Sequence, residues 1–243
     1  MKKLLLSSLV LTCLCGVTWA QQPVADLKLD FNRLKSWDTK RYEMLVPYSV
    51  TTALGGQTNK QVNINHAGIS TMATEVTGDS LILTETMERQ KMKMVYHCRK
   101  DNGLALLKSD MTMGNQTAIA EFKDGKMSVT ANGKVHEMPF PEDTLVEPAF
   151  LRLVTLLPRE KGGRFSFKHW SEMRGGPPSD SVPMTKAPLV IVCEGEDTIK
   201  LAGKDVRGTK YNLGNRYLAW VRDDGTLLRY ELPGRTILEL VAN

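Results

Sequence analysis

One stretch of this 243-residue sequence, Asp143–Leu157, has the spacing of an amphipathic helix, whereas the runs on both sides of it alternate as strands do. Its apolar residues recur at helical intervals. They are Leu145, Val146, Ala149, Phe150, Leu153, Val154 and Leu157. Glu147, Arg152 and Thr155 fall elsewhere on the helical wheel. A single helix with so wide an apolar face has to bury it, and the only partner that the sequence offers is a large antiparallel sheet.

The ends of this helix can be placed from its prolines and glycines. Pro148 suits a first helical turn, so we expect regular helix to begin near Glu147. Pro158 and the following Gly162-Gly163 are expected to end it.

Before the helix, the residues alternate between apolar and polar with a period of two. The clearest case has Met92, Met94, Tyr96 and Cys98 on one face, and Lys91, Lys93, His97 and Arg99 on the other. Turn signals follow at intervals of about ten residues, which is typical of a meander of antiparallel strands. These signals are Asp101-Asn102-Gly103, Gly114-Asn115, Lys123–Lys126 and Asn132-Gly133.

After the helix, the strand pattern resumes. Leu189–Cys193 is a continuous apolar run that predicts a buried strand, and Glu194–Asp197 predicts a turn into Thr198–Ala202. The whole pattern predicts a mainly β fold. We expect a single large curved antiparallel sheet, an open or half barrel of about 11–12 strands, with one main helix packed on its concave face.

Residues 1–20 have the features of a secretory signal. Lys2 and Lys3 precede the apolar core Leu4–Val17, and Thr18-Trp19-Ala20 resembles a cleavage site. The alternative, a membrane anchor, is disfavoured because the apolar run is too short to span a bilayer. We therefore expect a periplasmic or secreted protein cleaved after Ala20, with no transmembrane segment in the mature chain. Residues 21–243 are expected to form one domain, with 21–39 as a lead-in segment.

The net charge argues against one class of function, and the cysteine content predicts a disulfide. Removal of Lys2 and Lys3 with the signal lowers the net charge from +5 to +3, which is too small and too scattered for nucleic-acid binding. Cys98 and Cys193 are the cysteines beyond the signal. In an oxidising compartment such a pair predicts one disulfide, and two free thiols remain the alternative because the sequence does not place their Cα atoms.

No catalytic or cofactor motif is present. The histidines are spaced too widely for a metal motif. They are His66, His97, His136 and His169. We therefore expect no metal, no cofactor and no enzymatic activity. A hydrolase site spread over several strands is the least favoured hypothesis, and it predicts a polar pocket containing His66, His136 or His169 and an Asp or Glu.

Methionine is abundant, with 12 residues, most of them in the meander before the helix. This flexible and polarizable side chain suits a surface that accepts apolar ligands, but it also fills ordinary cores. We name as cavity candidates three residues of the meander, two of the helix and one of a late strand. They are Met92, Met94, Tyr96, Phe150, Leu153 and Trp220.

The order of elements resembles the lipoprotein-carrier superfamily of LolA and LolB and exported bacterial domains of unknown function similar to it. The resemblance rests on the signal segment, the Tyr42–Val50 strand, the helix end Leu156-Leu157-Pro158 and the late hairpin Leu218–Arg229. It implies an unclosed barrel with helices on its concave side, and either a hydrophobic cavity for acyl chains or a scaffold role at the envelope. Only one helix is evident in this sequence, so the cavity is expected to be shallow or filled.

Two functions of different classes follow from these features. The first is an exported, non-enzymatic protein that binds a lipid or another apolar small molecule in a half-barrel cavity. The second is a structural or interaction module with a filled core, whose partner is a protein of the cell envelope.

Overall fold

A computed structural model of the chain describes residues 20–37, 39–54, 57–101, 104–140, 144–167, 169–170, 189–214, 217–232 and 237–241. The expected signal segment lies outside the described residues, apart from Ala20. From Gln21 onward strands dominate, so the predicted mainly β class is confirmed.

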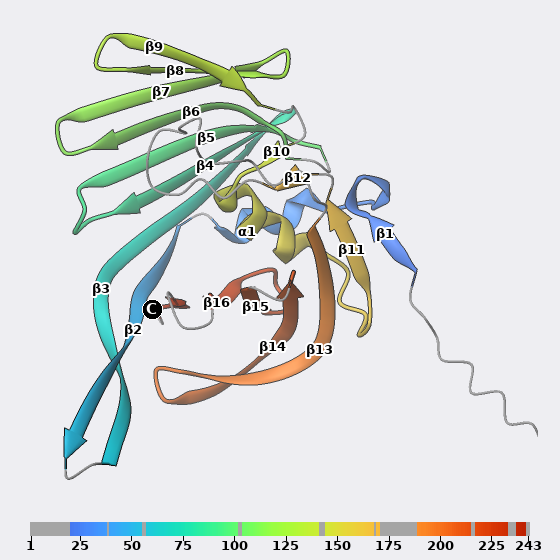
Figure 1. The fold of residues 1–243 in the computed structure, drawn as a ribbon. Helices are drawn as coiled ribbons and strands as arrows, with labels where there is room; N and C mark the ends of the chain where they lie inside the picture. The colour runs from blue at the N-terminus through green and yellow to red at the C-terminus, as the bar shows by residue number, and fades with distance from the viewer. Residues whose placement is uncertain are drawn as a thin grey trace, which may run out of the picture.

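The strands belong to one large sheet and one small one (Figure 1). The large sheet contains β1 (Gln21–Pro23), β2 (Lys40–Leu54), β3 (Gln57–Thr77), β4 (Ser80–Met87), β5 (Met92–Arg99), β6 (Leu106–Met113), β7 (Gln116–Lys123), β8 (Lys126–Ala131), β9 (Lys134–Pro139), β11 (Arg164–Phe167), β13 (Leu189–Leu201), β14 (Lys204–Leu213), β15 (Tyr217–Val221), β16 (Leu227–Glu231) and β17 (Ile237–Leu240). The small sheet pairs β10 (Thr144–Leu145) with β12 (His169–Trp170). The helices described are the 3-10 helices η1 (Val24–Asp26) and η2 (Phe31–Trp37) and the α-helix α1 (Glu147–Leu156).

The large sheet is open and almost entirely antiparallel. Its order is β1-β11-β13-β14-β15-β16-β17-β2-β3-β4-β5-β6-β7-β8-β9, and within it only β1 and β11 are parallel. The predicted open, curved antiparallel sheet with one helix is therefore confirmed. Its 15 strands in the described part exceed the predicted number of about 11–12. Short strands such as β1 pair through their backbones and need no alternating pattern of their own, so the sequence does not reveal them.

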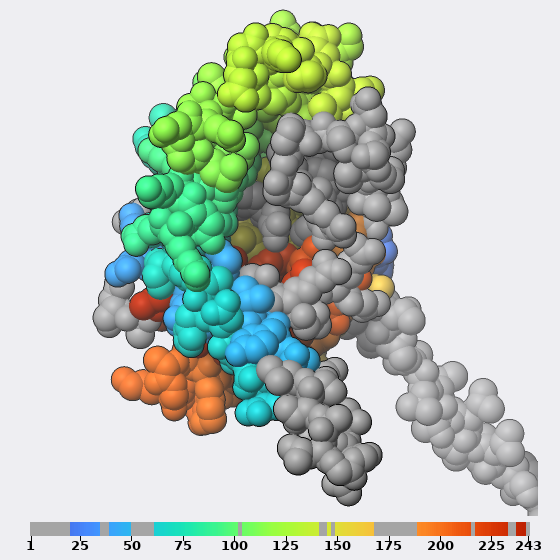
Figure 2. Space-filling view, turned by 60° about the vertical axis from the view of Figure 1, so that its left-hand side comes forward, coloured from blue at the N-terminus to red at the C-terminus, as the bar shows by residue number. Residues whose placement is uncertain are grey.

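The meander from β4 to β9 forms as predicted, although Asn102-Gly103 of one predicted turn lie outside the described residues. Asp124 and Gly125 have φ of +52° and +73°, and Asn132 and Gly133 have φ of +51° and +74°. Positive φ at both central residues defines the two-residue hairpin turn that Asp-Gly and Asn-Gly favour. Figure 2 shows these strands, in green to yellow-green, as a continuous wall of the molecular surface.

The strand β13 contradicts one sequence prediction. The turn expected at Glu194–Asp197 does not form, because β13 continues through these residues to Leu201. A β-bulge between Cys193 and Gly195 shifts the register of β13 against β14 instead. The turn into β14 lies at Ala202-Gly203. Since a bulge exchanges the two faces of a strand, the odd-numbered residues beyond it, among them Ile199 and Leu201, face away from the side on which Cys193 is buried.

The helix α1 lies in the hollow of the curved sheet (Figure 1). It spans Glu147–Leu156 with Pro148 in its first turn, as predicted. Its side chains belong to a main core cluster. This cluster also includes residues of the 3-10 helices and of strands that precede and follow α1 in the chain. Val24 and Leu34 of the lead-in segment are buried in this cluster. Within the described residues, no helix combines the length and the apolar character needed to cross a membrane.

A second, smaller core cluster consists of Ile199, Leu201, Trp220 and Leu228. It forms where the outer part of the β13–β14 hairpin packs on β15 and β16. The bulge in β13 explains this cluster, because it moves Ile199 and Leu201 to the face that Trp220 occupies on β15.

Candidate functional site

The space between α1 and the sheet, where the sequence predicts a ligand cavity, is occupied by side chains. Phe150 and Leu153 of α1 have no exposed surface. The ring of Phe150 packs edge-on against that of Phe167, with 6.2 Å between the ring centroids. This part of the interface is therefore a packed core, in agreement with the filled-core hypothesis.

The three cavity candidates of the meander lie on one face of β5, the face toward α1. Tyr96 belongs to the main core cluster, Met94 packs against it, and Met92 is half-buried. The Tyr96 hydroxyl contacts Met94 Sδ at 3.0 Å. The alternation predicted for Met92–Cys98 is thus confirmed.

The sheet register extends this surface with further methionines. Met92 lies opposite both Met87 and Met113, and Met94 lies opposite Met111. Met113 is 47% exposed, and the other four are half-buried. We call these five residues the methionine face: Met87, Met92, Met94, Met111 and Met113. This face includes the predicted cavity candidates Met92 and Met94, and it stays partly accessible.

Trp220 does not join the other cavity candidates, so its assignment to the helix side of the sheet is wrong. Ala219 and Val221 of β15 belong to the main core cluster, whereas Trp220 between them belongs to the second cluster. Consecutive residues of a strand point to opposite faces, which places the indole away from α1. Its Nε1 donates a hydrogen bond to Asp197 Oδ2 at 2.9 Å.

The predicted disulfide is not formed, because Cys98 and Cys193 are both free and buried. Their strands, β5 and β13, are separated in the sheet by β14, β15, β16, β17, β2, β3 and β4. Burial raises the pKa of the Cys98 thiol to about 12, and it also raises the pKa of Cys193.

A buried charge is the feature that sequence reasoning missed. Arg152 of α1 is completely buried and contacts consecutive residues of β3. Its Nε donates to Thr74 Oγ1 at 3.0 Å, and its Nη2 donates to the Ala73 carbonyl at 3.2 Å. Its Nη1 lies 3.5 Å from Met72 Sδ. These contacts connect the helix to the inner face of the sheet.

The nearby acid is Glu85 of β4, which is also buried and accepts a 2.8 Å hydrogen bond from the Ser70 hydroxyl. Burial raises the pKa of Glu85, while the Ser70 hydrogen bond and the charge of Arg152 oppose that rise. Burial lowers the pKa of Arg152 to about 10, and the negative charge of Glu85 opposes this change. We call Arg152, Glu85, Ser70 and Thr74 the buried polar cluster.

One signal in the sequence could have revealed that Arg152 is buried. Leu151 and Leu156 lie off the predicted apolar face, yet both are buried. A helix with apolar residues on all sides is covered on all sides, so a polar residue within it is buried as well.

The histidines form no site in the described residues. His66 Nδ1 lies 2.6 Å from Glu43 Oε1, and His97 Nε2 lies 3.7 Å from Asp110 Oδ2, both pairs near the surface. His136 is exposed. No group of metal-ligating side chains occurs among the described residues, and neither pocket described here has a histidine in its lining.

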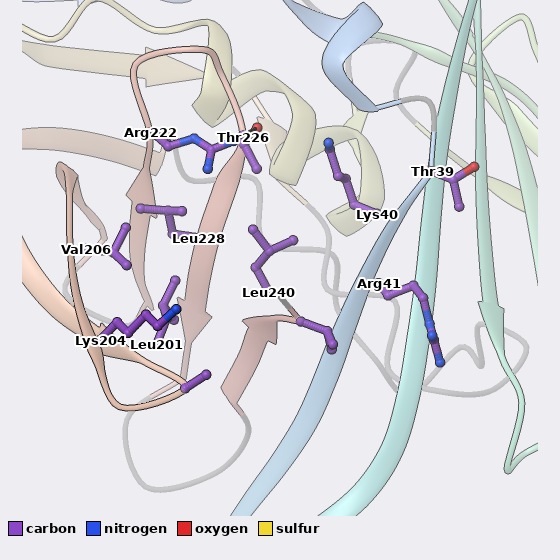
Figure 3. A pocket seen from close by; sticks show the side chains of 12 residues that line it. Thr39, Lys40, Arg41, Leu201, Lys204, Val206, Arg222, Thr226, Leu228 and Leu240 are labelled. Carbon is purple, nitrogen blue, oxygen red and sulfur yellow. Dashed lines mark hydrogen bonds between the residues drawn. The ribbon is translucent and has the colours of Figure 1, made fainter. Parts of the chain in front are cut away.

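One of these pockets opens beside the second core cluster (Figure 3). Its volume is about 360 Å³. It lies between the start of β2, the tip of the β13–β14 hairpin, the β15–β16 turn and β17. Its lining residues are Thr39, Lys40, Arg41, Leu201, Ala202, Lys204, Val206, Arg222, Thr226, Leu228, Leu240 and Val241. We call it the basic pocket, because four of these described residues are Lys or Arg and none is Asp or Glu.

No protein-family model and no curated protein matches the chain. Among solved structures, the chain is similar to a β-barrel-like protein of the domain of unknown function DUF1849 from Brucella abortus. The identity is 10% over 84% of this chain and 95% of that chain, and the TM-score is 0.37. It is also similar to a DUF1089 family protein from Pseudomonas aeruginosa, with 14% identity over 68% of this chain and 89% of that chain and a TM-score of 0.33.

Proposed function

We propose that this chain is an exported, non-enzymatic protein that binds a lipid or another apolar ligand. The observation that carries the proposal is the methionine face, an apolar surface inside the curved sheet that is left partly exposed. Export is supported by the signal-like sequence of residues 1–20.

The methionine face has the chemistry that an acyl chain requires. Met92, Met87 and Met113 form one cross-strand row, and Met94 and Met111 form the next. Unbranched thioether side chains repack easily around ligands of different shape. Each CH₂ group removed from water would contribute about 0.8 kcal/mol to binding.

Native mass spectrometry of protein purified without detergent, combined with uptake of a fluorescent fatty acid, tests the proposal. We expect a bound lipid mass or saturable uptake. The double variant Met92→Glu/Met111→Glu should abolish the uptake that takes place at the methionine face, because it places two charges there.

A matched control is Ile119→Glu/Val135→Glu, which adds the same charge on the opposite face of the same meander, where both residues are exposed. This control should bind normally. Protein that shows only the ligand-free mass and takes up no fatty acid would refute the proposal.

A second candidate is an interaction module of the cell envelope, and the β2–β3 hairpin favours it. The pairing of β17 with β2 extends only as far as Leu45, and the pairing of β4 with β3 starts only at Ser70. Beyond these points the hairpin projects alone (Figure 1) and exposes Tyr48, Val62 and Ile64 by 49%, 63% and 52%. Unpaired strand edges and exposed apolar side chains are features of protein-binding surfaces. This candidate would be favoured if the variant Tyr48→Lys/Val62→Lys no longer bound an envelope protein that the wild type binds, and if the wild type took up no ligand.

A further inference from the structure

We propose that the basic pocket binds an anionic amphiphile, with one alkyl chain against its apolar floor and a carboxylate or phosphate head group on its lysines. The pocket shares no residue with the methionine face, so the inference does not rest on the proposed function.

The charge of the lining points to an anion. Lys40 and Lys204 form no ion pair with any described residue. Arg222 is neutralised by Asp224, with 2.6 Å between Nη2 and Oδ2, and its Nη2 also lies 3.3 Å from Thr226 Oγ1. Two lysines that pair with no carboxylate of the described residues line one pocket and create a positive potential that a negative head group would satisfy.

The floor of the pocket points to an alkyl chain. Leu201 and Leu228 belong to the second core cluster, and Val206 and Leu240 pack against it while remaining partly exposed. In Figure 3 these four side chains occupy the middle of the pocket, and Lys40, Lys204 and Arg222 stand around them. A free inorganic anion would leave this apolar floor in contact with water, whereas an amphiphile covers it.

The size of the pocket limits the alkyl chain to medium length. Its volume of about 360 Å³ lies near the lower end of the range for small-molecule sites, roughly 300–1,000 Å³. The lining contains no aromatic side chain on which a nucleobase could stack. The geometry therefore fits a single medium-length chain with one anionic head group.

Titration calorimetry of the full mature chain with decanoate, decyl phosphate, decanol and inorganic phosphate tests this proposal. We expect decanoate or decyl phosphate to bind in a salt-dependent way, and the tighter of the two identifies the head group. Decanol should bind at least about tenfold more weakly because it lacks the charge. Equal binding of decanol, or tight binding of inorganic phosphate alone, would overturn the proposal.

Two double variants locate the site. Lys40→Glu/Lys204→Glu should weaken binding by more than about tenfold, whereas Lys126→Glu/Lys134→Glu changes the net charge equally on exposed sites of the meander and should not. If charge reversal impairs folding, the milder variant Lys40→Gln/Lys204→Gln replaces it in the test and should also weaken binding. Met92→Glu/Met111→Glu should leave decanoate binding to the basic pocket unchanged. Equal effects of the two lysine pairs would refute the assignment.

Discussion

Arg152 shows how one side chain sets the position of α1 on the sheet. Its guanidinium donates to Thr74 and to the Ala73 carbonyl, so the helix is connected to β3 by directional bonds as well as by apolar packing. Glu85 supplies the opposite charge from β4. A buried charge pair contributes little net stability, but removal of one partner leaves the other charge buried without compensation.

We expect Arg152→Met to lower the free energy of unfolding by about 3–5 kcal/mol, because Glu85 then lacks its counter-charge. The double variant Arg152→Met/Glu85→Leu should recover most of this loss, since no buried charge remains. Urea unfolding of the wild type, both single variants and the double variant measures the coupling. Losses that simply add in the double variant would show that the two side chains act independently.

The turn between β15 and β16 depends on a second charged residue. Asp224 accepts hydrogen bonds from Arg222 Nη2 at 2.6 Å and from the Thr226 backbone N–H at 2.9 Å. Burial acts to raise the pKa of Asp224, but these hydrogen bonds outweigh it and lower the pKa to about 2, from an ordinary value of 3.8.

A lowered pKa in the folded state means that the folded protein binds fewer protons than the unfolded protein between pH 3.8 and about 2. The stabilisation by Asp224 is therefore complete above pH 3.8 and is lost as the pH falls toward 2. Asp224→Asn should reduce stability at pH 6 by less than about 1 kcal/mol, because half of the side chain is exposed. The difference should vanish near pH 2, as followed by denaturant unfolding. A difference that is constant with pH would contradict an ionic origin.

At the level of elements, β14 approaches the β15–β16 hairpin too closely to carry a side chain at Gly208. A Cβ at this position would lie 2.8 Å from Leu228 Cδ1 and 3.1 Å from the Val221 carbonyl oxygen. Gly208 thus packs directly against Leu228 of the second core cluster, which is why a glycine is needed within a regular strand.

We expect Gly208→Ala to lower the free energy of unfolding by about 1–3 kcal/mol, because the Val221 backbone cannot move as freely as a side chain can. Arg207→Ala is the matched control, since Arg207 is adjacent and exposed, and it should change stability by less than about 0.5 kcal/mol. Thermal and urea unfolding measure both. An unchanged Gly208→Ala protein would mean that β14 packs less tightly on β15 and β16 than described.

At the level of the whole molecule, one sheet contains strands from the early and the late parts of the chain. β17 pairs with β2, and the Tyr42 hydroxyl donates to the Leu227 carbonyl of β16 at 3.1 Å. The residues before and after α1 therefore share one sheet and one main core. This arrangement also keeps Cys98 and Cys193 apart, on strands with seven others between them in the sheet order.

We expect both thiols to be unreactive in the folded protein and to react together on unfolding, since both are buried and the pKa of each is raised. Alkylation of oxidised and reduced samples, with and without denaturant, followed by intact-mass measurement, tests this. If denatured protein were alkylated only after a reductant is added, a disulfide between Cys98 and Cys193 would be established instead.

The sequence by itself determined the parts of this protein that depend on local interactions. Helix spacing and Pro148 located α1, alternation placed Met92, Met94 and Tyr96 on one face, and Asp-Gly and Asn-Gly located the turns of the meander. In each case the signal lies within a few residues, where backbone preference and apolar periodicity act directly.

Only the tertiary structure decided which residues of β3 Arg152 contacts, the orientation of Trp220 and the lining of the basic pocket. A bulge at Cys193 and Gly195 exchanges the faces of β13, and sheet curvature brings Lys40 of β2 to the same pocket as Lys204 of β14. Both effects depend on which strands meet across the folded chain. Such contacts arise between residues far apart in sequence, so no local pattern encodes them.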